Sequence, residues 1–252
     1  MTRARGFTLI ELAIVLVIVT ILIGGLAVPL SAQIQARRIA ETNKTLEEAH
    51  NALTGYAMLT AKLIPIGHPY LPCPDITGDG REDRDTVTGE CSGSIGGVVT
   101  PISYGWFPWV TLGVAPQDAW GNRLRYVVIS QFAKPGTGFS GTPPPGTLIT
   151  ICTTHACPAL SSKAASVAFA LISHGPNGWG AQNMNNAPGI SQAAPTGPDE
   201  TQNLASNPAD PILVTRAPTK ADDALGEFDD LVAWTSLTEL IGRVCLRALD
   251  CQ

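Results

Sequence analysis

A single acidic residue, Glu11, lies inside an otherwise apolar run near the N-terminus. The run covers residues 7–30 and follows a short leader, residues 1–6, that carries Arg3 and Arg5. These 24 residues would span about 36 Å as a helix, enough to cross the roughly 30 Å hydrocarbon core of a bilayer. An ionised carboxylate in hydrocarbon costs about 2.5–3.5 kcal/mol even on lenient scales. We therefore expect a positively charged partner for Glu11, either Arg5 or a newly formed N-terminal amine.

Two ordinary interpretations of this run remain open. It fits an N-terminal anchor in which an acid is tolerated at the membrane surface. A secretory signal fits less well, because the apolar core of such a signal is usually about 7–15 residues long and lacks an acid. Gly25-Leu26-Ala27 would be the cleavage site in that case.

The sequence Gly6-Phe7-Thr8-Leu9-Ile10-Glu11 resembles the class III signal of type IV pilins and type II secretion pseudopilins. The resemblance implies cleavage by prepilin peptidase between Gly6 and Phe7, and N-methylation of the new Phe7 amine. It also implies that Glu11 pairs with the Phe7 amine of a neighbouring subunit during filament assembly. The close match covers about the first thirty residues.

A glycine-containing acidic turn is the first candidate metal site. Four oxygen-bearing side chains follow the spacing of an EF-hand-type calcium loop: Asp75, Thr77, Asp79 and Asp83. Gly80 stands at the sixth position, but the twelfth is Thr86 and not a bidentate glutamate. Calcium binding and a solvated acidic turn are the two interpretations.

A second acidic group precedes the last predicted strand. It consists of Asp222, Asp223, Glu227, Asp229 and Asp230. The major pseudopilin of the resembled family carries a calcium site in a late acidic loop. Its ligand pattern does not match this segment residue for residue, so a calcium site and a polar edge both remain open.

Six cysteines behind a membrane leader indicate an oxidising compartment and disulfides. Three sequence-local pairs stand out among the possible pairings: Cys73–Cys91, Cys152–Cys157 and Cys245–Cys251. A zinc site at Cys152, His155 and Cys157 lacks a fourth ligand and is disfavoured.

Enzymatic chemistry is not predicted. A G-x-G-x-x-G pattern at residues 136–141 is followed by prolines at residues 143–145, where a phosphate-binding helix would have to begin. The four histidines show no triad or metal spacing, and no hydrolase or P-loop motif occurs. The net charge of −5 gives no basic field for nucleic acid.

The rest of the chain predicts an α+β fold. An amphipathic stripe at Ile39, Leu46, Ala49, Leu53 and Tyr56 continues the N-terminal helix through residues 31–64. A disulfide-stapled head follows at residues 65–252, with strands expected at 124–130, 148–152, 167–173 and 231–234. We expect these strands to form an antiparallel sheet packed on the helix.

Three local features of the head add to this picture. The turn Asp118-Ala-Trp-Gly-Asn122 resembles the heads of pseudopilins, particularly the major one. Ser236 with Glu239 predicts a capped C-terminal helix. Residues 175–220 are poor in apolar runs and read as a long surface loop.

The sequence thus predicts a structural subunit of a type IV pilus-like or type II secretion filament, minor or specialised because of its large head. The alternative is an adhesin-like binding module at a filament tip, motivated by the predicted loop. The resemblance implies other subunits, prepilin peptidase, an inner-membrane assembly platform and the membrane as partners. It places the head in the periplasm before assembly, and then in an extracellular pilus or a periplasmic pseudopilus.

Overall fold

The chain forms two compact units, residues 1–41 and residues 42–252, and each is described by itself. The computed structural model describes residues 8–63, 68–93, 101–140, 148–186, 190–205, 211–245 and 251, with the backbone alone for residues 24–29, 63 and 205.

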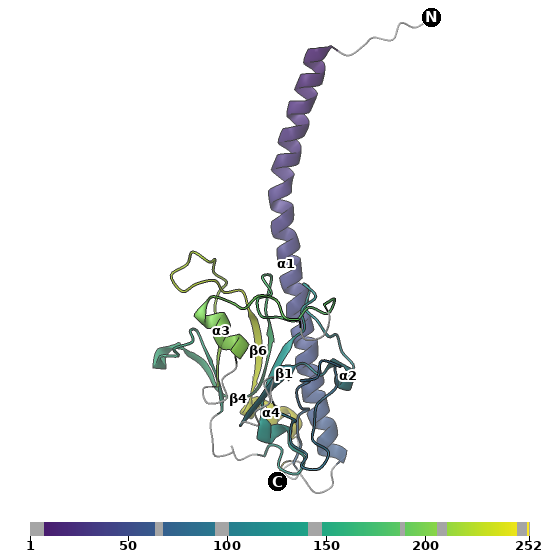
Figure 1. The fold of residues 1–252 in the computed structure, drawn as a ribbon, viewed down its shortest axis with the longest axis vertical. Helices are drawn as coiled ribbons and strands as arrows, with labels where there is room; N and C mark the ends of the chain where they lie inside the picture. The colour runs from purple at the N-terminus through teal and green to yellow at the C-terminus, as the bar shows by residue number, and fades with distance from the viewer. Residues whose placement is uncertain are drawn as a thin grey trace, which may run out of the picture. The chain divides into compact units, whose positions relative to one another are not determined.

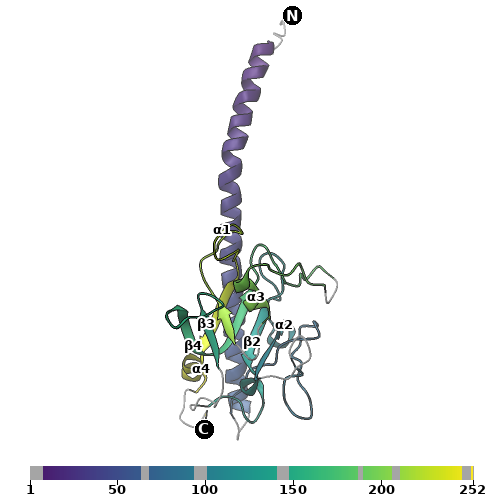
Figure 2. The same cartoon turned by 60° about the vertical axis from the view of Figure 1, so that its left-hand side comes forward.

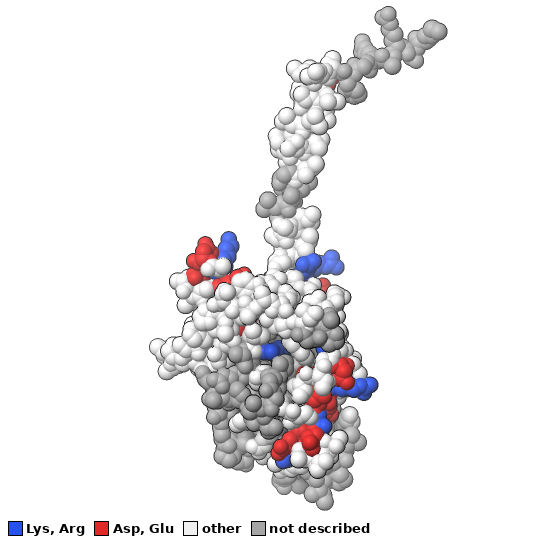
Figure 3. Space-filling model, in the orientation of Figure 1, with Lys and Arg blue, Asp and Glu red and all other residues white. Residues whose placement is uncertain are grey.

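Helix α1 (Leu9–Leu63) begins in the first unit and continues into the second (Figure 1). All described side chains of residues 8–23 are exposed, and the N-terminal part of α1 presents an almost uncharged surface (Figure 3). No helix in the described part of the chain is long and apolar enough to cross a membrane. The transmembrane segment predicted at residues 7–30 is therefore not found, although Phe7 and the side chains of residues 24–29 lie outside the described residues.

In the second unit, one face of α1 is buried. Leu46, Ala49, Leu53 and Ala57 recur every three or four residues, and each is at most 3% exposed. This spacing places them on one face of the helix. Leu46, Ala49 and Leu53 of the predicted stripe are thus buried, whereas Ile39 and Tyr56 are only partly buried.

Six strands form one sheet that packs against this part of α1 (Figures 1 and 2). They are β1 (Ile102–Trp106), β2 (Arg125–Ile129), β3 (Ile149–Cys152), β4 (Ser162–Ser173), β5 (Ile212–Val214) and β6 (Leu231–Ser236). The sequence predicts four of them in place, but it misses β1 and β5. Strand β4 also begins five residues before its predicted start at residue 167.

Strand β4 is the centre of the sheet. It pairs antiparallel with β2, β3 and β6, and β2 pairs antiparallel with β1. Strand β5, however, runs parallel to β3. The sheet is therefore mixed, and the prediction of an antiparallel sheet is wrong at this edge. Parallel pairing requires a long connection, and the chain between β3 and β5, which includes β4 and α3, supplies it.

Short helices complete the second unit. They are α2 (Trp109–Leu112), α3 (Pro198–Ala205) and α4 (Leu237–Val244), with 3-10 turns η1 (Ser130–Ala133) and η2 (Ala159–Ser161). The hydroxyl of Ser236 accepts a hydrogen bond from the backbone N–H of Glu239 at 3.2 Å, so α4 has the predicted N-cap. Helix α4 packs on β4 and β6 through its buried residues Leu237, Leu240 and Val244.

The buried face of α1 meets the sheet at β4 and β6. The imidazole of His50 lies 5.6 Å from the Phe169 ring on β4, centroid to centroid, and its Nε2 contacts the hydroxyl of Thr235 on β6. Tyr126 on β2 is fully buried and donates its hydroxyl to the carbonyl of Pro72 at 3.2 Å. The core thus lies between α1 and one face of the sheet.

Three disulfides are present: Cys73–Cys91, Cys152–Cys157 and Cys245–Cys251. These are the three pairs that sequence proximity singles out. The first closes the loop around the acidic turn, and the second joins the end of β3 to the turn that leads to β4. The third joins residue 251 to the residue that follows α4.

The segment at residues 175–220 is not simply the surface loop that its composition predicts. It contains α3 and β5, and its residues Asp199, Asn203 and Leu213 are at most 2% exposed. Its polar composition reflects buried hydrogen bonds, since the Asn203 side chain bonds both the N–H and the carbonyl of Val214. This removes the observation that motivated a displayed binding loop.

Two leucines on α1 test the packing of this helix. Leu53 is fully buried and Leu59 is 54% exposed. We expect Leu53→Ala to lower the free energy of unfolding by about 2–5 kcal/mol because it leaves a cavity in the core. Leu59→Ala should change it by less than about 0.5 kcal/mol. Urea denaturation followed by tryptophan fluorescence measures both, and equal effects would mean that α1 does not pack on the sheet through this face.

Candidate functional site

The N-terminus of α1 is capped by the side chains of Thr8 and Glu11. The N–H and hydroxyl of Thr8 donate to Oε2 of Glu11 at 2.8 and 2.9 Å, and the N–H of Glu11 donates to the Thr8 hydroxyl at 3.3 Å. This reciprocal pattern is a capping box, which satisfies N–H groups that a helix start leaves free. Glu11 is thus held by its own chain. Gly6 and Phe7, the predicted processing residues, lie outside the described residues.

In the first acidic turn, the oxygens of Asp75 are occupied by the turn itself. Its Oδ1 accepts from the N–H of Gly78 at 2.6 Å, and its Oδ2 accepts from the N–H of Gly80 at 2.8 Å. The guanidinium of Arg123 lies 3.8 Å from the same Oδ2. The residue is fully buried, so these contacts replace its hydration.

The other predicted ligands of this turn behave in the same way. Asp83 Oδ2 accepts from the N–H of Thr77 at 2.9 Å, and Asp79 Oδ1 accepts from the N–H of Arg81 at 2.8 Å. The Thr77 hydroxyl lies 3.4 Å from both Asp75 Oδ1 and Asp83 Oδ1. The structure therefore brings Asp75, Thr77 and Asp83 together, but backbone donors take most of the oxygens that a cation would need. This favours a self-capped turn, and calcium binding there stays a prediction.

A second group of carboxylates lies in the interior of the head. One oxygen each of Glu200, Asp229 and Asp230 lies within 4.8 Å of the others; we call this group the acidic centre. Glu200 comes from the first turn of α3, and the two aspartates directly precede β6. Pro198 at the start of α3, with acids in its first turn, is typical of a helix N-terminus, which explains why Glu200 is fixed there.

The Glu200 carboxylate accepts from the backbone of Asp229, and both carboxylates accept from Asn177. Glu200 Oε1 accepts from the N–H of Asp229 at 2.9 Å and from the side-chain amide of Asn177 at 3.3 Å. Asp229 Oδ2 accepts from the N–H of Asn177 at 3.0 Å. Asp229 Oδ1 is buried and has no hydrogen-bond partner among the described residues. A bound ligand could supply the polar contact that this buried oxygen lacks.

Asp230 faces the interior of the head. Its Oδ1 lies 3.2 Å from Nδ1 of His174, and its Oδ2 accepts from the side-chain amide of Asn203 at 2.8 Å. Arg125 on β2 is a buried cation that interacts electrostatically with Asp230; it is 4% exposed and donates to the carbonyl of Leu204. Burial lowers the pKa of Arg125 to about 10, and attraction to Tyr104 and Asp230 opposes that fall.

Crowding and burial disfavour the ionised forms of these acids. Burial, reinforced by the charge of Glu200, raises the pKa of Asp229 to about 7. Burial, reinforced by Asp230, also raises the pKa of Glu200. Three close carboxylates are costly to ionise unless a cation neutralises them. Hard carboxylate oxygens with one unpaired acceptor fit Ca²⁺, so these residues fit the ion better than the first acidic turn does.

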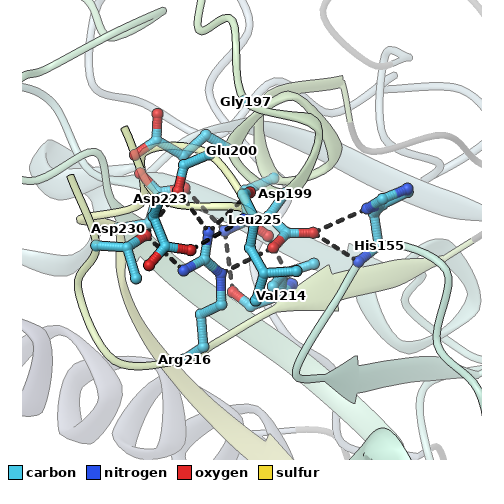
Figure 4. A network of polar contacts seen from close by, with 12 residues as sticks. His155, Gly197, Asp199, Glu200, Val214, Arg216, Asp223, Leu225 and Asp230 are labelled. Carbon is cyan, nitrogen blue, oxygen red and sulfur yellow. Dashed lines mark hydrogen bonds and ion pairs between the residues drawn. The ribbon is translucent and has the colours of Figure 1, made fainter. Parts of the chain in front are cut away.

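A neighbouring network is built around Asp199, the residue before Glu200 (Figure 4). Asp199 Oδ1 accepts from the N–H of His155 at 2.8 Å and lies 2.9 Å from its Nδ1, and Oδ2 accepts from Nε of Arg216 at 2.8 Å. Arg216 also donates to the carbonyls of Leu225 and Gly226. Asp199 thus joins the turn after β3 to the loop before β6.

Sequence reasoning identified Asp229 and Asp230 but missed Glu200. Glu200 lies 29 residues before Asp229 in a segment that composition assigns to a loop. The Pro198-Asp199-Glu200 run is the signature of a helix start and could have indicated α3. Asp222 and Asp223 of the same acidic group are exposed and do not join the centre.

Comparison with known proteins bears on the N-terminus alone. Residues 1–27 match the family model of the prokaryotic N-terminal methylation motif, the class III signal of type IV pilins and pseudopilins. The resemblance of these residues is thereby confirmed. Neither curated proteins nor solved structures give a match to the chain.

The raised pKa of Asp229 gives a pH test of the acidic centre. A carboxyl whose pKa is higher in the folded state stabilises the fold when protonated, and this contribution is lost as pH rises from about 4 through about 7. The wild type should therefore lose unfolding free energy between pH 5 and pH 8 in the presence of chelator, whereas Asp229→Asn should not. The unfolding free energy of the variant should rise by about 1–2 kcal/mol relative to that of the wild type over this range. Urea midpoints at the two pH values measure the difference. A wild-type-to-variant difference that does not change with pH would show that Asp229 is not crowded.

Proposed function

We propose that this chain is a structural subunit of a type IV pilus-like or type II secretion filament, and that it is a minor or specialised one. The observation that carries the proposal is the N-terminal methylation motif at residues 1–27, which supports processing by prepilin peptidase. The exposed surface of residues 8–23, on which Glu11 is the one charged residue, supports packing among several such helices. The large disulfide-linked head supports a specialised role.

Assembly in this proposal exchanges one set of contacts of Glu11 for another. In the single chain, Oε2 of Glu11 accepts both hydrogen bonds from Thr8. Cleavage after Gly6 would create an ammonium group at Phe7, and the Phe7 amine of a neighbouring subunit would then supply the cation that a carboxylate in an apolar bundle requires. The capping box keeps the Glu11 carboxylate at the helix start until that partner arrives.

The proposed route follows from the same motif. The chain would be inserted in the inner membrane with its head in the periplasm, meet prepilin peptidase and an assembly platform there, and then enter a pilus or a pseudopilus. The turn Asp118-Ala-Trp-Gly-Asn122 supports the secretion filament. Asp118 caps this turn by accepting from the N–H groups of Trp120 and Asn122, each at 2.9 Å, and accepts from Ser173 on β4 at 2.7 Å.

We further propose calcium as a structural ligand of the head, bound at the acidic centre. The support is the close set of carboxylate oxygens and the orphaned Oδ1 of Asp229. Calcium there would neutralise like charges that otherwise oppose folding. Glu200, Asp229 and Asp230 would hold it.

Processing and assembly are tested together in a host with and without the peptidase. We expect the mature N-terminus to be N-methyl-Phe7 only when the peptidase is present, as read by mass spectrometry. Glu11→Leu should still be processed, yet its cross-linked multimers should fall at least about tenfold, because the register-setting ion pair is lost. Glu47→Leu changes an exposed acid farther along α1 and should assemble normally. An intact leader, or a start near Val28, would contradict the proposal.

Calcium binding is tested by the melting temperature of the full chain in detergent. Calcium at about 100 times its dissociation constant should stabilise the head by about 2.7 kcal/mol, seen as a higher Tm than in chelator. Glu200→Gln should remove most of this shift, since it removes a ligand charge. Asp79→Asn, in the first acidic turn, should keep it. The reverse pattern would assign the ion to the first turn, and an unchanged wild-type Tm would exclude calcium.

A further inference from the structure

One ionisable side chain of α1, His50, lies where the helix meets the sheet beside the start of α4. Its ring faces Phe169 on β4, with 5.6 Å between the ring centroids, and its Nε2 contacts the hydroxyl of Thr235 on β6. Thr235 is fully buried and directly precedes Ser236, the N-cap of α4. The imidazole of His50 therefore contacts two strands of the sheet next to the point where α4 begins.

The side of α1 that packs on the head is otherwise uncharged. Its fully or almost fully buried residues are Thr42, Leu46, Ala49, Leu53, Thr54, Ala57 and Thr60. His50 is half-buried beside them and is the single histidine of α1. Histidine is the side chain that ordinarily changes its charge between pH 5 and pH 8. A proton on this ring would therefore bring a positive charge into the packed side of the helix.

Charged groups face the ring from α1 and from α4. Glu47 lies one turn before His50 on α1, and Glu239 and Arg243 form a 2.9 Å ion pair on α4. The residues that contact the ring from β4 and β6 are uncharged. Burial lowers the pKa of His50, and the charge of Arg243 adds to this fall. A hydrogen bond to Asn51 and the charges of Glu239 and Glu47 oppose the fall without reversing it.

The neutral ring therefore fits this position better than the charged one. An imidazolium donates from both ring nitrogens and can no longer accept a hydrogen bond, and its charge is costly in a half-buried place that Arg243 also faces. We propose that His50 makes the attachment of α1 to the sheet depend on pH, such that the neutral ring holds the helix and a proton on the ring loosens it.

The direction of the effect follows from proton linkage. Because the pKa of His50 is lower in the folded chain, the unfolded chain binds this proton more readily. The contribution of His50 to stability is complete above about pH 6.5 and is lost as pH falls below that value. Asp229 acts in the opposite direction, since its pKa is raised and its contribution is lost as pH rises.

This inference depends neither on the proposed filament nor on calcium. It concerns the contact between the head and the helix that carries the N-terminal motif. A mildly acidic medium weakens that contact, whereas a neutral one maintains it.

An NMR titration of the full chain in detergent, labelled with ¹³C-histidine, measures the protonation of the His50 ring directly. The signal is assigned with His50→Gln. We expect its midpoint in the wild type to lie below 6.5, the ordinary value for histidine. A midpoint at or above 6.5 would overturn the proposal, because the folded head would then not favour the neutral ring.

Hydrogen–deuterium exchange measures the attachment of α1, once the intrinsic effect of pH on exchange has been corrected for. Between about pH 8 and pH 5, peptides covering residues 46–60 of α1 should exchange about threefold faster or more in the wild type. His50→Gln keeps a hydrogen-bonding side chain that does not titrate, so it should remove this increase. His155→Gln, at a half-exposed histidine that bonds Asp199, should keep it.

The outcomes are separable. An equal increase in His50→Gln would overturn the proposal, because another group would then cause it. Exchange of α1 that is the same at both pH values in the wild type would overturn it as well. If His50→Gln does not fold, the wild-type midpoint still decides, with the His50 signal assigned by elimination from variants of the other three histidines.

Discussion

The packing of one face of α1 against the sheet is the interaction on which the head depends. Leu46, Ala49 and Leu53 are almost completely buried, and burying a leucine side chain contributes about 1.5–3 kcal/mol relative to leaving it exposed. Strand β4 lies opposite this face through Phe169, and β2, β3 and β6 all take their register from β4. A sheet with short outer strands needs a helix packed against it, because isolated strand pairs are only marginally stable in water. The helix that carries the N-terminal motif is thus also the support of the head.

Buried charge is the second constraint on the head. The chain places Asp230, Glu200 and Asp199 within the same region with exposures of 5% or less, and each is matched to donors from a different element. Such networks are costly when incomplete, because a low-dielectric interior penalises every unpaired group. The polar segment between β4 and β6 is therefore structured by these hydrogen bonds as well as by its few buried apolar residues, such as Leu213 and Phe228.

The sequence allowed some parts of this structure to be predicted and not others. The class III motif and the stripe of α1 depend on contiguous residues and on a single period, so they were readable. Strand β1 contains Gly105, which weakens the strand pattern, and β5 is only three residues long, so neither gave a clear periodic signal. The spacing of Asp75, Thr77, Asp79 and Asp83 predicted that oxygens would gather, but it could not show that the N–H groups of Gly78 and Gly80 would occupy them. Glu200 was missed because its partners are distant in sequence.

The order of strands has a consequence for the chain as it leaves the ribosome. Strands β2, β3 and β4 follow one another and can pair early, whereas β6 joins β4 only after the long segment that carries α3 and β5. One edge of the central strand therefore stays unpaired until residues 231–236 have been synthesised, and exposed strand edges invite association with other chains. The head therefore closes late, and α3 and β5 must be in place before β4 gains its last partner.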